Sequence, residues 1–459
     1  MVSDSLADAS KWGQVAFTPD GKVHIIWEED YHDSGGSDIF YASYDGFEWN
    51  GPIKITNSRN IPKERPHVST SQDGGVFAVW NQAGEVYFRE YDPISDKWLP
   101  DKRIATGDYE AGEPQVAVDP DGNIYIFWFA EAGRTYSRSR INGEWENIFR
   151  LSSTRRATQG GIAAGKDGRV WVIWREKQSN GEYKIYYRKR TKNTEWSSAE
   201  PMNWAGASQS HPCIAVGPDH VPVVSYEDVD VGEQREIWIC TLDEDENPRE
   251  MVEGVALHHY SRIAIDSEGN KHVAWQIGPG DFGFGIKYTN NMDGKWKSPV
   301  VMPNSSGWPK LPGIAADEGG NVALVWASSI SGRDKEIWFS SLYPVELKRF
   351  DPPAVASCEI AVSAAMRGAD ISYTITWEKN PNNTEKFISG YNIYVKEGQQ
   401  DWQIFKFVDK SEVESDETTY RKTYSSGTDF TTGGANVKRQ FGITTVSTWG
   451  QESDLKIID

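Results

Sequence analysis

The sequence predicts an all-β protein, a seven-bladed β-propeller of four-stranded blades followed by a C-terminal β-sandwich. Three observations lead to this prediction. Aromatic residues make up 12% of the 459 residues and glycine occurs 42 times, which favours many short strands joined by tight turns. One phrase recurs along the chain: an apolar strand, a turn usually with Asp or Gly, and a second apolar strand ending in an aromatic residue. The recurrence stops near residue 350, where other strand patterns begin.

The first half of each repeat is this phrase. It occurs seven times, at residues 13–27, 67–80, 114–128, 160–174, 212–226, 261–275 and 312–326. The aromatic residues that end the phrases are Trp27, Trp80, Trp128, Trp174, Tyr226, Trp275 and Trp326. Their mean spacing is about 50 residues, the length of a propeller blade.

The second half of each repeat adds two strands. A third strand with an aromatic or apolar centre follows at 38–43, 85–90, 134–139, 184–189, 236–241, 285–290 and 336–341. A tryptophan opens a fourth strand in five repeats: Trp49, Trp98, Trp145, Trp196 and Trp296. A single four-stranded sheet cannot bury both faces, whereas seven arranged radially can. We therefore assign residues 1–350 to the propeller, with the last strand expected at 344–350 and residues 3–10 as an alternative source.

A second domain is expected at 351–459. Asp351-Pro352-Pro353 breaks the repeats, and strand patterns follow at 372–379, 390–397 and 440–453. This length suits a β-sandwich. The strand patterns with Trp377, Tyr391 and Tyr394 resemble a fibronectin type III domain, which implies a spacer module of the kind common in secreted carbohydrate enzymes and surface proteins.

The first domain also resembles a known superfamily. Residues 43–49 read SYDGFEW, similar to the Asp-box turn between the third and fourth strands of sialidase-like propellers, and 141–145 and 291–296 are weaker echoes. The resemblance implies that the ligand-binding face is built from the loops entering the first strand and leaving the second. It implies little about activity.

Composition and charge exclude several classes. The 48 basic and 67 acidic residues give a net charge of −19, which disfavours nucleic-acid binding and docking on anionic lipid. No apolar run is long enough for a membrane span, so we expect no membrane insertion. The three cysteines have neither metal nor disulfide spacing, and we expect no cofactor and no metal. No signal peptide is visible in this chain, and the resemblances favour an extracellular or cell-surface protein.

Positions that differ between repeats are free to serve function. One such column precedes the first strand of each repeat: Trp12, Arg65, Glu113, Gln159, His211, Tyr260 and Leu311. Two residues later, with the same side-chain direction, stand Gln14, His67, Gln115, Gly161, Cys213, Arg262 and Gly313. Both columns are expected around one mouth of the central channel. The alternative interpretation is that such mouths are polar because they are wet.

Loops on the same face add further candidates. Glu29, Glu176 and Glu227 follow second strands, and His258, His259, Tyr260 and Arg262 form a dense titratable cluster. The candidate ligand-binding residues are Trp12, Arg65, His67, Glu113, Arg175, Glu227 and Trp308, and the candidate catalytic residues are Tyr260, His259, Arg262 and His211.

Three functions remain open, and whether the protein is an enzyme is undecided. The first is recognition of a polysaccharide or glycoconjugate without proven catalysis, because Arg binds carboxylates and Tyr and Trp stack on sugars. The second is a carbohydrate-active enzyme, either a lyase using His or Tyr with Arg, or a glycoside hydrolase using two carboxylates. A true sialidase is disfavoured, since Lys11-Trp12-Gly13-Gln14 stands where that family has a Phe/Tyr-Arg-Ile-Pro motif. The third is a scaffold that contacts other surface proteins.

Overall fold

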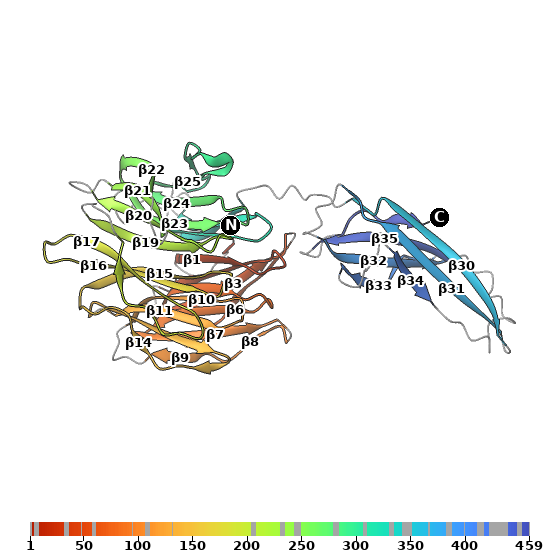
Figure 1. Cartoon of the computed structure of the whole chain (residues 1–459), viewed down its shortest axis with the longest axis horizontal. Coiled ribbons are helices and arrows are strands. Elements are labelled where there is room, and N and C mark those ends of the chain that lie inside the picture. Colours follow the sequence, from red (N-terminus) through yellow and green to blue (C-terminus); the bar gives the residue numbers. More distant parts are fainter. Residues whose placement is uncertain are drawn as a thin grey trace. The chain divides into compact units, whose positions relative to one another are not determined.

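The computed structural model divides into two compact units, residues 1–343 and 344–459 (Figure 1). The residues that the structure describes are 2–3, 9–31, 36–46, 48–56, 61–93, 95–105, 111–130, 132–202, 208–229, 235–242, 249–278, 284–305, 310–329, 335–341, 351–365, 368–381, 388–398, 400–410, 417–421, 439–447, 452 and 453–458. Among them, strands dominate and the helical element is a short 3-10 turn, Met292–Gly294. No helix in this part of the chain has the length and apolar character needed to cross a bilayer.

The first unit is a seven-bladed β-propeller, as the sequence predicts. Blade 1 comprises β1 (Ala9–Phe17), β2 (Val23–Tyr31), β3 (Gly36–Tyr44) and β4 (Trp49–Lys54). Blade 2 comprises β5 (Lys63–Thr70), β6 (Val76–Gln82), β7 (Glu85–Asp92), β8 (Lys97–Trp98) and β9 (Lys102–Ala105). Blade 3 comprises β10 (Ala111–Val118), β11 (Ile124–Ala130), β12 (Arg134–Ile141), β13 (Glu144–Trp145) and β14 (Phe149–Arg150). Blade 4 comprises β15 (Ala157–Ala164), β16 (Val170–Lys177), β17 (Tyr183–Arg190) and β18 (Glu200–Pro201), and blade 5 comprises β19 (Gln209–Val216), β20 (Pro222–Val229), β21 (Arg235–Thr241) and β22 (Arg249–Ala256). Blade 6 comprises β23 (His258–Ile265), β24 (Lys271–Ile277), β25 (Gly285–Asn290) and β26 (Val300–Val301). Blade 7 comprises β27 (Lys310–Ala316), β28 (Val322–Ser329) and β29 (Lys335–Ser341).

The blades form a closed ring. Within each blade the strands pair antiparallel in chain order, and we call them strands A to D. Each strand A contacts the strand A of the next blade, in the order β1, β5, β10, β15, β19, β23 and β27, and β27 contacts β1. The seven first strands therefore surround one central channel.

The recurring aromatic residues of strand B form the core between blades. Trp27, Trp80, Trp128, Trp174, Tyr226, Trp275 and Trp326 are each at most 1% exposed. Each packs among apolar residues of its own and a neighbouring blade, as Trp128 does with Val79 and Phe88 of blade 2. Burying such large rings contributes strongly to stability. This repeated packing explains why the aromatic period is so regular in the sequence.

The N-terminus closes the ring. The amide of Val2 donates to the carbonyl of Ile337 at 2.8 Å, and the amide of Ile337 donates to Ser3 Oγ at 2.8 Å. Ala9 also pairs in parallel with Lys335. The N-terminal segment therefore lies against β29 at the outer edge of blade 7. The strand predicted at 344–350 lies outside the described residues.

The second unit is a β-sandwich. One sheet has the order β30 (Val355–Ala365), β31 (Gly368–Glu378), β34 (Glu417–Arg421), and the other β33 (Gln403–Asp409), β32 (Ile388–Glu397), β35 (Arg439–Ser447), β36 (Lys456–Ile458). Trp377 and Tyr391 come from different sheets and meet with ring centroids 5.2 Å apart. Both are at most 2% exposed and lie in one apolar core.

Candidate functional site

A ring of left-handed residues surrounds one end of the propeller channel. Near its start, each strand A has a register shift, and the residue at the shift has a positive φ between 39° and 57°. These residues are Trp12, Arg65, Glu113, Gln159, His211, Tyr260 and Leu311. None is glycine, so each conformation costs roughly 1–2 kcal/mol. These seven bulge residues are the first of the two variable columns found in the sequence, and the bulge is what places them at the same position in every blade.

These seven residues, which we call the bulge ring, enclose a cavity. All seven residues line a space of about 540 Å³, within the usual size range of small-molecule sites. From the second column, Gln14, His67, Gln115, Cys213 and Arg262 line the same cavity. The first column and five of the seven residues of the second therefore line one cavity, and that they bind a ligand stays a prediction.

One side of the ring carries a linked aromatic, cation and anion from three consecutive blades. The guanidinium of Arg65 lies 5.1 Å from the centre of the Trp12 ring, and its Nη1 lies 3.0 Å from Glu113 Oε1. Both charged side chains are about one-third exposed, so this pair adds little stability. It does present a stacking surface and both signs of charge to the cavity.

A buried carboxylate supports the backbone of this side. Glu28, on strand B of blade 1, accepts a hydrogen bond from the Arg65 amide at 3.3 Å. Burial raises the pKa of Glu28 to about 7, although the charge of Lys11 opposes the shift. Glu28 thus connects the bulge of blade 2 to blade 1.

The opposite side of the ring is organised by Glu227. This side chain is fully buried and accepts hydrogen bonds from His211 Nδ1 at 2.9 Å, from Arg235 and from the amide of Tyr260. Burial alone would raise the pKa of Glu227, but the charges and hydrogen bonds of His211 and Arg235 lower it to about 2. Because the carboxylate is ionised, Nδ1 of His211 must carry the proton that it shares with Glu227.

The other ring nitrogen of His211, Nε2, does not take part in the hydrogen bond to Glu227. With Nδ1 protonated, Nε2 is the acceptor of the neutral ring. The ring of His211 contacts that of Tyr260, with centroids 4.4 Å apart, and both residues line the cavity. This pair places an imidazole and a phenol side by side at the channel mouth.

His67 lies deeper in the same cavity and is neutral at neutral pH. Burial lowers its pKa to about 4, and the charge of Arg262 contributes. Its Nδ1 accepts the amide of Val116 at 3.3 Å. His67 is therefore suited to hydrogen bonding rather than to carrying charge.

Three predicted site residues lie behind the cavity wall. Glu227 accepts hydrogen bonds from His211 and from the amide of Tyr260, and Arg175 donates to Ser210 Oγ at 2.9 Å and Thr158 Oγ1 at 3.1 Å. His259 is 5% exposed and, like Glu227 and Arg175, does not line the cavity. Its neighbour Tyr260 does, because successive strand residues point in opposite directions. Trp308 lies outside the described residues.

Other sequence candidates on this face serve the core. The buried indole nitrogen of Trp174 donates to Glu176 Oε2 at 3.1 Å, that of Trp27 donates to Glu29, and that of Trp275 donates to His258 Nδ1 at 3.1 Å. These acceptors satisfy indole N–H groups that burial would otherwise leave unpaired.

Arg235 is a residue of the site that the sequence columns did not identify. It opens strand C of blade 5, donates to Glu227 and also lies 3.5 Å from Ser210 Oγ as a donor. The available signal was a charged residue at the start of a third strand, at the position that holds Arg134 in blade 3 and Lys335 in blade 7.

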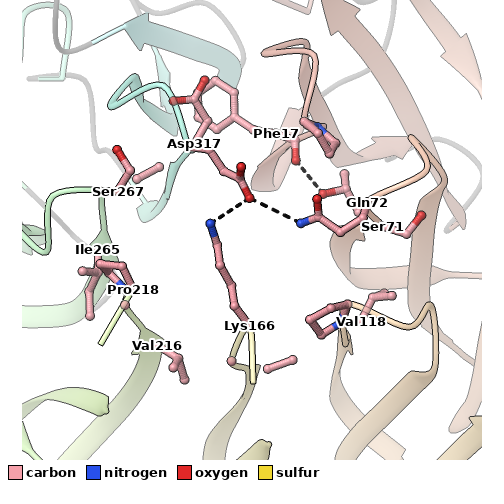
Figure 2. A pocket seen from close by; sticks show the side chains of 18 of the residues that line it. Phe17, Ser71, Gln72, Val118, Lys166, Val216, Pro218, Ile265, Ser267 and Asp317 are labelled. Atoms are coloured by element: carbon pink, nitrogen blue, oxygen red, sulfur yellow. Dashed lines mark hydrogen bonds and ion pairs between the residues drawn. The ribbon is translucent and has the colours of Figure 1, made fainter. Parts of the chain in front are cut away.

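The other end of the channel is bridged by polar side chains. A second cavity of about 280 Å³ is lined there by the ends of the A strands and the A–B turns. Figure 2 shows Lys166 and Gln72 extending into it from different blades. Lys166 Nζ lies 2.8 Å from Glu318 Oε1, and Gln72 Nε2 donates to the same oxygen at 3.5 Å. Blades 2, 4 and 7 are thus linked across the channel at this end.

Within the described ranges no group of three or more His, Cys, Asp or Glu is arranged to hold a metal ion. Cys213, Cys240 and Cys358 are free thiols.

Comparisons with known proteins give structural likeness at low identity. No protein-family model matches the sequence, and no curated protein matches it. Similar solved structures include a protein of unknown function from Dyadobacter fermentans, with a TM-score of 0.46 at 14% identity over 72% of this chain and 94% of that one. A mutant NanB sialidase from Streptococcus pneumoniae has a TM-score of 0.46 at 8% identity over 61% and 67% of the two chains. AofleA from Arthrobotrys oligospora has a TM-score of 0.41 at 11% identity over 60% and 85%. At these values the likenesses carry no functional argument, and the fold rests on the ring of blades itself.

Proposed function

We propose that the protein recognises a glycan at the bulge-ring end of the propeller channel. The observation that carries this proposal is the ring of seven left-handed residues with different side chains. Trp12 and Tyr260 offer flat faces for the C–H surface of a sugar, while Arg65, Glu113 and Gln159 offer hydrogen bonds to hydroxyl and acidic groups. The bulge itself recurs in every blade, whereas the side chain that it carries differs from blade to blade and is free to serve a ligand.

We also propose that the second unit is a fibronectin type III-like spacer and that the protein is extracellular or on the cell surface. The division into a three-stranded and a four-stranded sheet supports the spacer assignment. The Asp-box likeness of residues 43–49 supports a sialidase-like propeller, because Asp45 accepts the amide of Glu48 at 2.8 Å in the turn between strands C and D. Under the scaffold alternative, the partners would be other surface proteins.

A glycan-binding screen tests the principal proposal. Purified protein is titrated against neutral, sialylated and uronate-containing oligosaccharides. Trp12→Ala and Arg65→Ala are each expected to weaken binding about 30-fold, the effect of losing a central contact of some 2 kcal/mol. Trp49→Ala is the matched control, since Trp49 is 36% exposed on β4 and does not line the cavity. Absence of binding across the panel, or equal losses in Trp12→Ala and Trp49→Ala, would contradict the proposal.

The pair formed by His211 and Glu227 favours a second candidate, an elimination on a uronate. His211 Nε2 would take the proton α to the carboxylate, the C–H electrons would form a C=C bond, and the C–O bond to the neighbouring sugar would break. The departing oxygen would take a proton from Tyr260, whose ring contacts His211. Arg65 and Arg262 line the cavity, and one of them would neutralise the negative charge of the uronate carboxylate.

Product analysis tests this second candidate. Incubation with uronate polysaccharides should give new chain ends with an unsaturated uronate. His211→Ala should reduce that rate roughly 10²–10⁴-fold while substrate still binds, which is the usual range for a lost general base. Binding without new chain ends would leave recognition alone, and saturated ends would instead indicate hydrolysis.

A further inference from the structure

A shallow cationic groove lies between blades 3 and 4, beside the bulge ring. It has a volume of about 580 Å³ and is lined by residues 132–133, 155–156, 158, 177–179, 181 and 183. Among the residues that the structure describes, the groove lining includes three cations, Arg155, Arg156 and Lys177, and no aspartate or glutamate. Among the described residues, none forms an ion pair with these three cations. In a chain with a net charge of −19, three neighbouring cations without a carboxylate partner indicate an anionic ligand.

The backbone under these cations is fixed from both blades. The amide of Ala157 donates to the Gly133 carbonyl at 2.9 Å, and the amide of Lys177 donates to the Arg156 carbonyl at 3.1 Å. The amide of Arg156 also donates to Thr154 Oγ1 at 3.3 Å, and that hydroxyl donates to buried Glu176. The segment that carries Arg155 and Arg156 is therefore held before any ligand arrives, which lowers the entropy cost of binding.

The groove lies next to the bulge ring, because consecutive residues of strand A in blade 4 line the two cavities. Tyr183 forms part of its wall, with the guanidinium of Arg175 at 4.2 Å and Nζ of Lys177 at 5.7 Å from its ring centre. Thr158 lines the groove, and the next residue, Gln159, lines the channel cavity. A chain molecule seated in the channel mouth can thus extend past Tyr183 to the cations.

We propose that this groove is a subsite for the anionic group of an acidic polysaccharide, either a uronate carboxylate or a sulfate ester. The inference rests on the proposed glycan recognition and specifies its ligand class. The channel mouth binds one sugar unit, and Arg155, Arg156 and Lys177 bind the charge of a unit further along the same chain. Guanidinium groups suit both anions, because their paired N–H donors match two oxygens.

The test compares matched ligands with a matched control variant. Affinities are measured for a uronate oligosaccharide, for the same oligosaccharide with its carboxyl groups reduced to alcohols, and for a sulfated neutral oligosaccharide. The test variant is Arg155→Gln/Arg156→Gln/Lys177→Gln. The control variant Lys22→Gln/Lys97→Gln/Lys295→Gln removes the same charge from loops around the A–B and C–D turns, which lie at the other end of the blades.

The expected result is a loss of discrimination. Wild-type protein should bind one acidic ligand at least about tenfold more tightly than the reduced one, a typical gain from charged hydrogen bonds. The test variant should lose that preference and much of the salt dependence while its affinity for the reduced ligand stays the same. The acidic ligand that shows the preference identifies the anion as carboxylate or sulfate.

Two outcomes would overturn the subsite while leaving glycan recognition intact. These are equal affinity for acidic and reduced ligands, and an equal loss of preference in the test and control variants, which would indicate long-range charge alone. Failure of wild-type protein to bind any of the three ligands would instead contradict the proposed function itself.

Discussion

Replacement of Glu227 by alanine should lower the free energy of unfolding of the propeller by about 3–5 kcal/mol, the usual cost of removing one partner of a buried ion pair. Glu227 is fully buried, and its loss leaves Arg235, whose side chain is 18% exposed, without its carboxylate. The amide of Tyr260 would also lose its acceptor. Chemical denaturation followed by tryptophan fluorescence measures this change.

The same carboxylate should make stability depend on pH in the acid range. Its pKa is about 2 in the folded protein, below the ordinary value of 4.5. The unfolded chain therefore binds the proton first as pH falls, so the contribution of Glu227 is complete above pH 4.5 and is lost as pH falls toward 2. The shift corresponds to about 3 kcal/mol.

Glu227→Gln should remove this dependence, so wild type and variant should differ most above pH 4.5 and converge toward pH 2. Glu113→Gln is the matched control, because Glu113 pairs with an arginine in the same ring but is about one-third exposed. It should change stability by less than about 1 kcal/mol. Equal pH profiles for the two variants would show that burial of Glu227 does not organise the site.

The seven blades and the position of the bulge ring could be predicted from the sequence, because both recur with the period of the repeat. Burial of one aromatic residue per blade gives the regular spacing of Trp27 to Trp326, and variation at one position between repeats marked the channel mouth. The left-handed backbone was not predicted, because none of the seven side chains signals a positive φ. The bulge, although not the sign of φ, does have a signal in the next residue, which is glycine or proline in six of the seven blades and serine in the other: Gly13, Pro66, Pro114, Gly160, Pro212, Ser261 and Pro312.

Comparing equivalent positions of the repeats could not predict contacts between different segments of the chain. Glu227 and Arg175 lie one position after the core aromatics Tyr226 and Trp174, and only the fold shows that they support the ring from behind. The cationic groove likewise joins Arg155 and Arg156 before strand A to Lys177 at the end of strand B. No repeat position links these residues, so a search for periodicity passes over them.

The packing beneath the groove leads to the second large expected effect, that of Gly133→Ala. Gly133 has φ +75°, and a Cβ there would lie 2.2 Å from the carbonyl oxygen of Arg155. Gly122 has nearly the same φ of +78°, with no atom within 4 Å of a Cβ. Gly122→Ala should therefore cost about 1 kcal/mol for its backbone conformation alone.

Gly133→Ala should cost about 3–5 kcal/mol, because the added methyl group must also push back the segment that carries Arg155 and Arg156. Denaturation of both variants measures the difference, and equal stabilities would show that the backbone of Arg155 does not pack against Gly133. A second measurement separates local from global damage. In conditions where Gly133→Ala remains folded, it should lose the preference for acidic over reduced oligosaccharide. Gly122→Ala should retain it, because of the two glycines only Gly133 packs against the backbone that carries the cations.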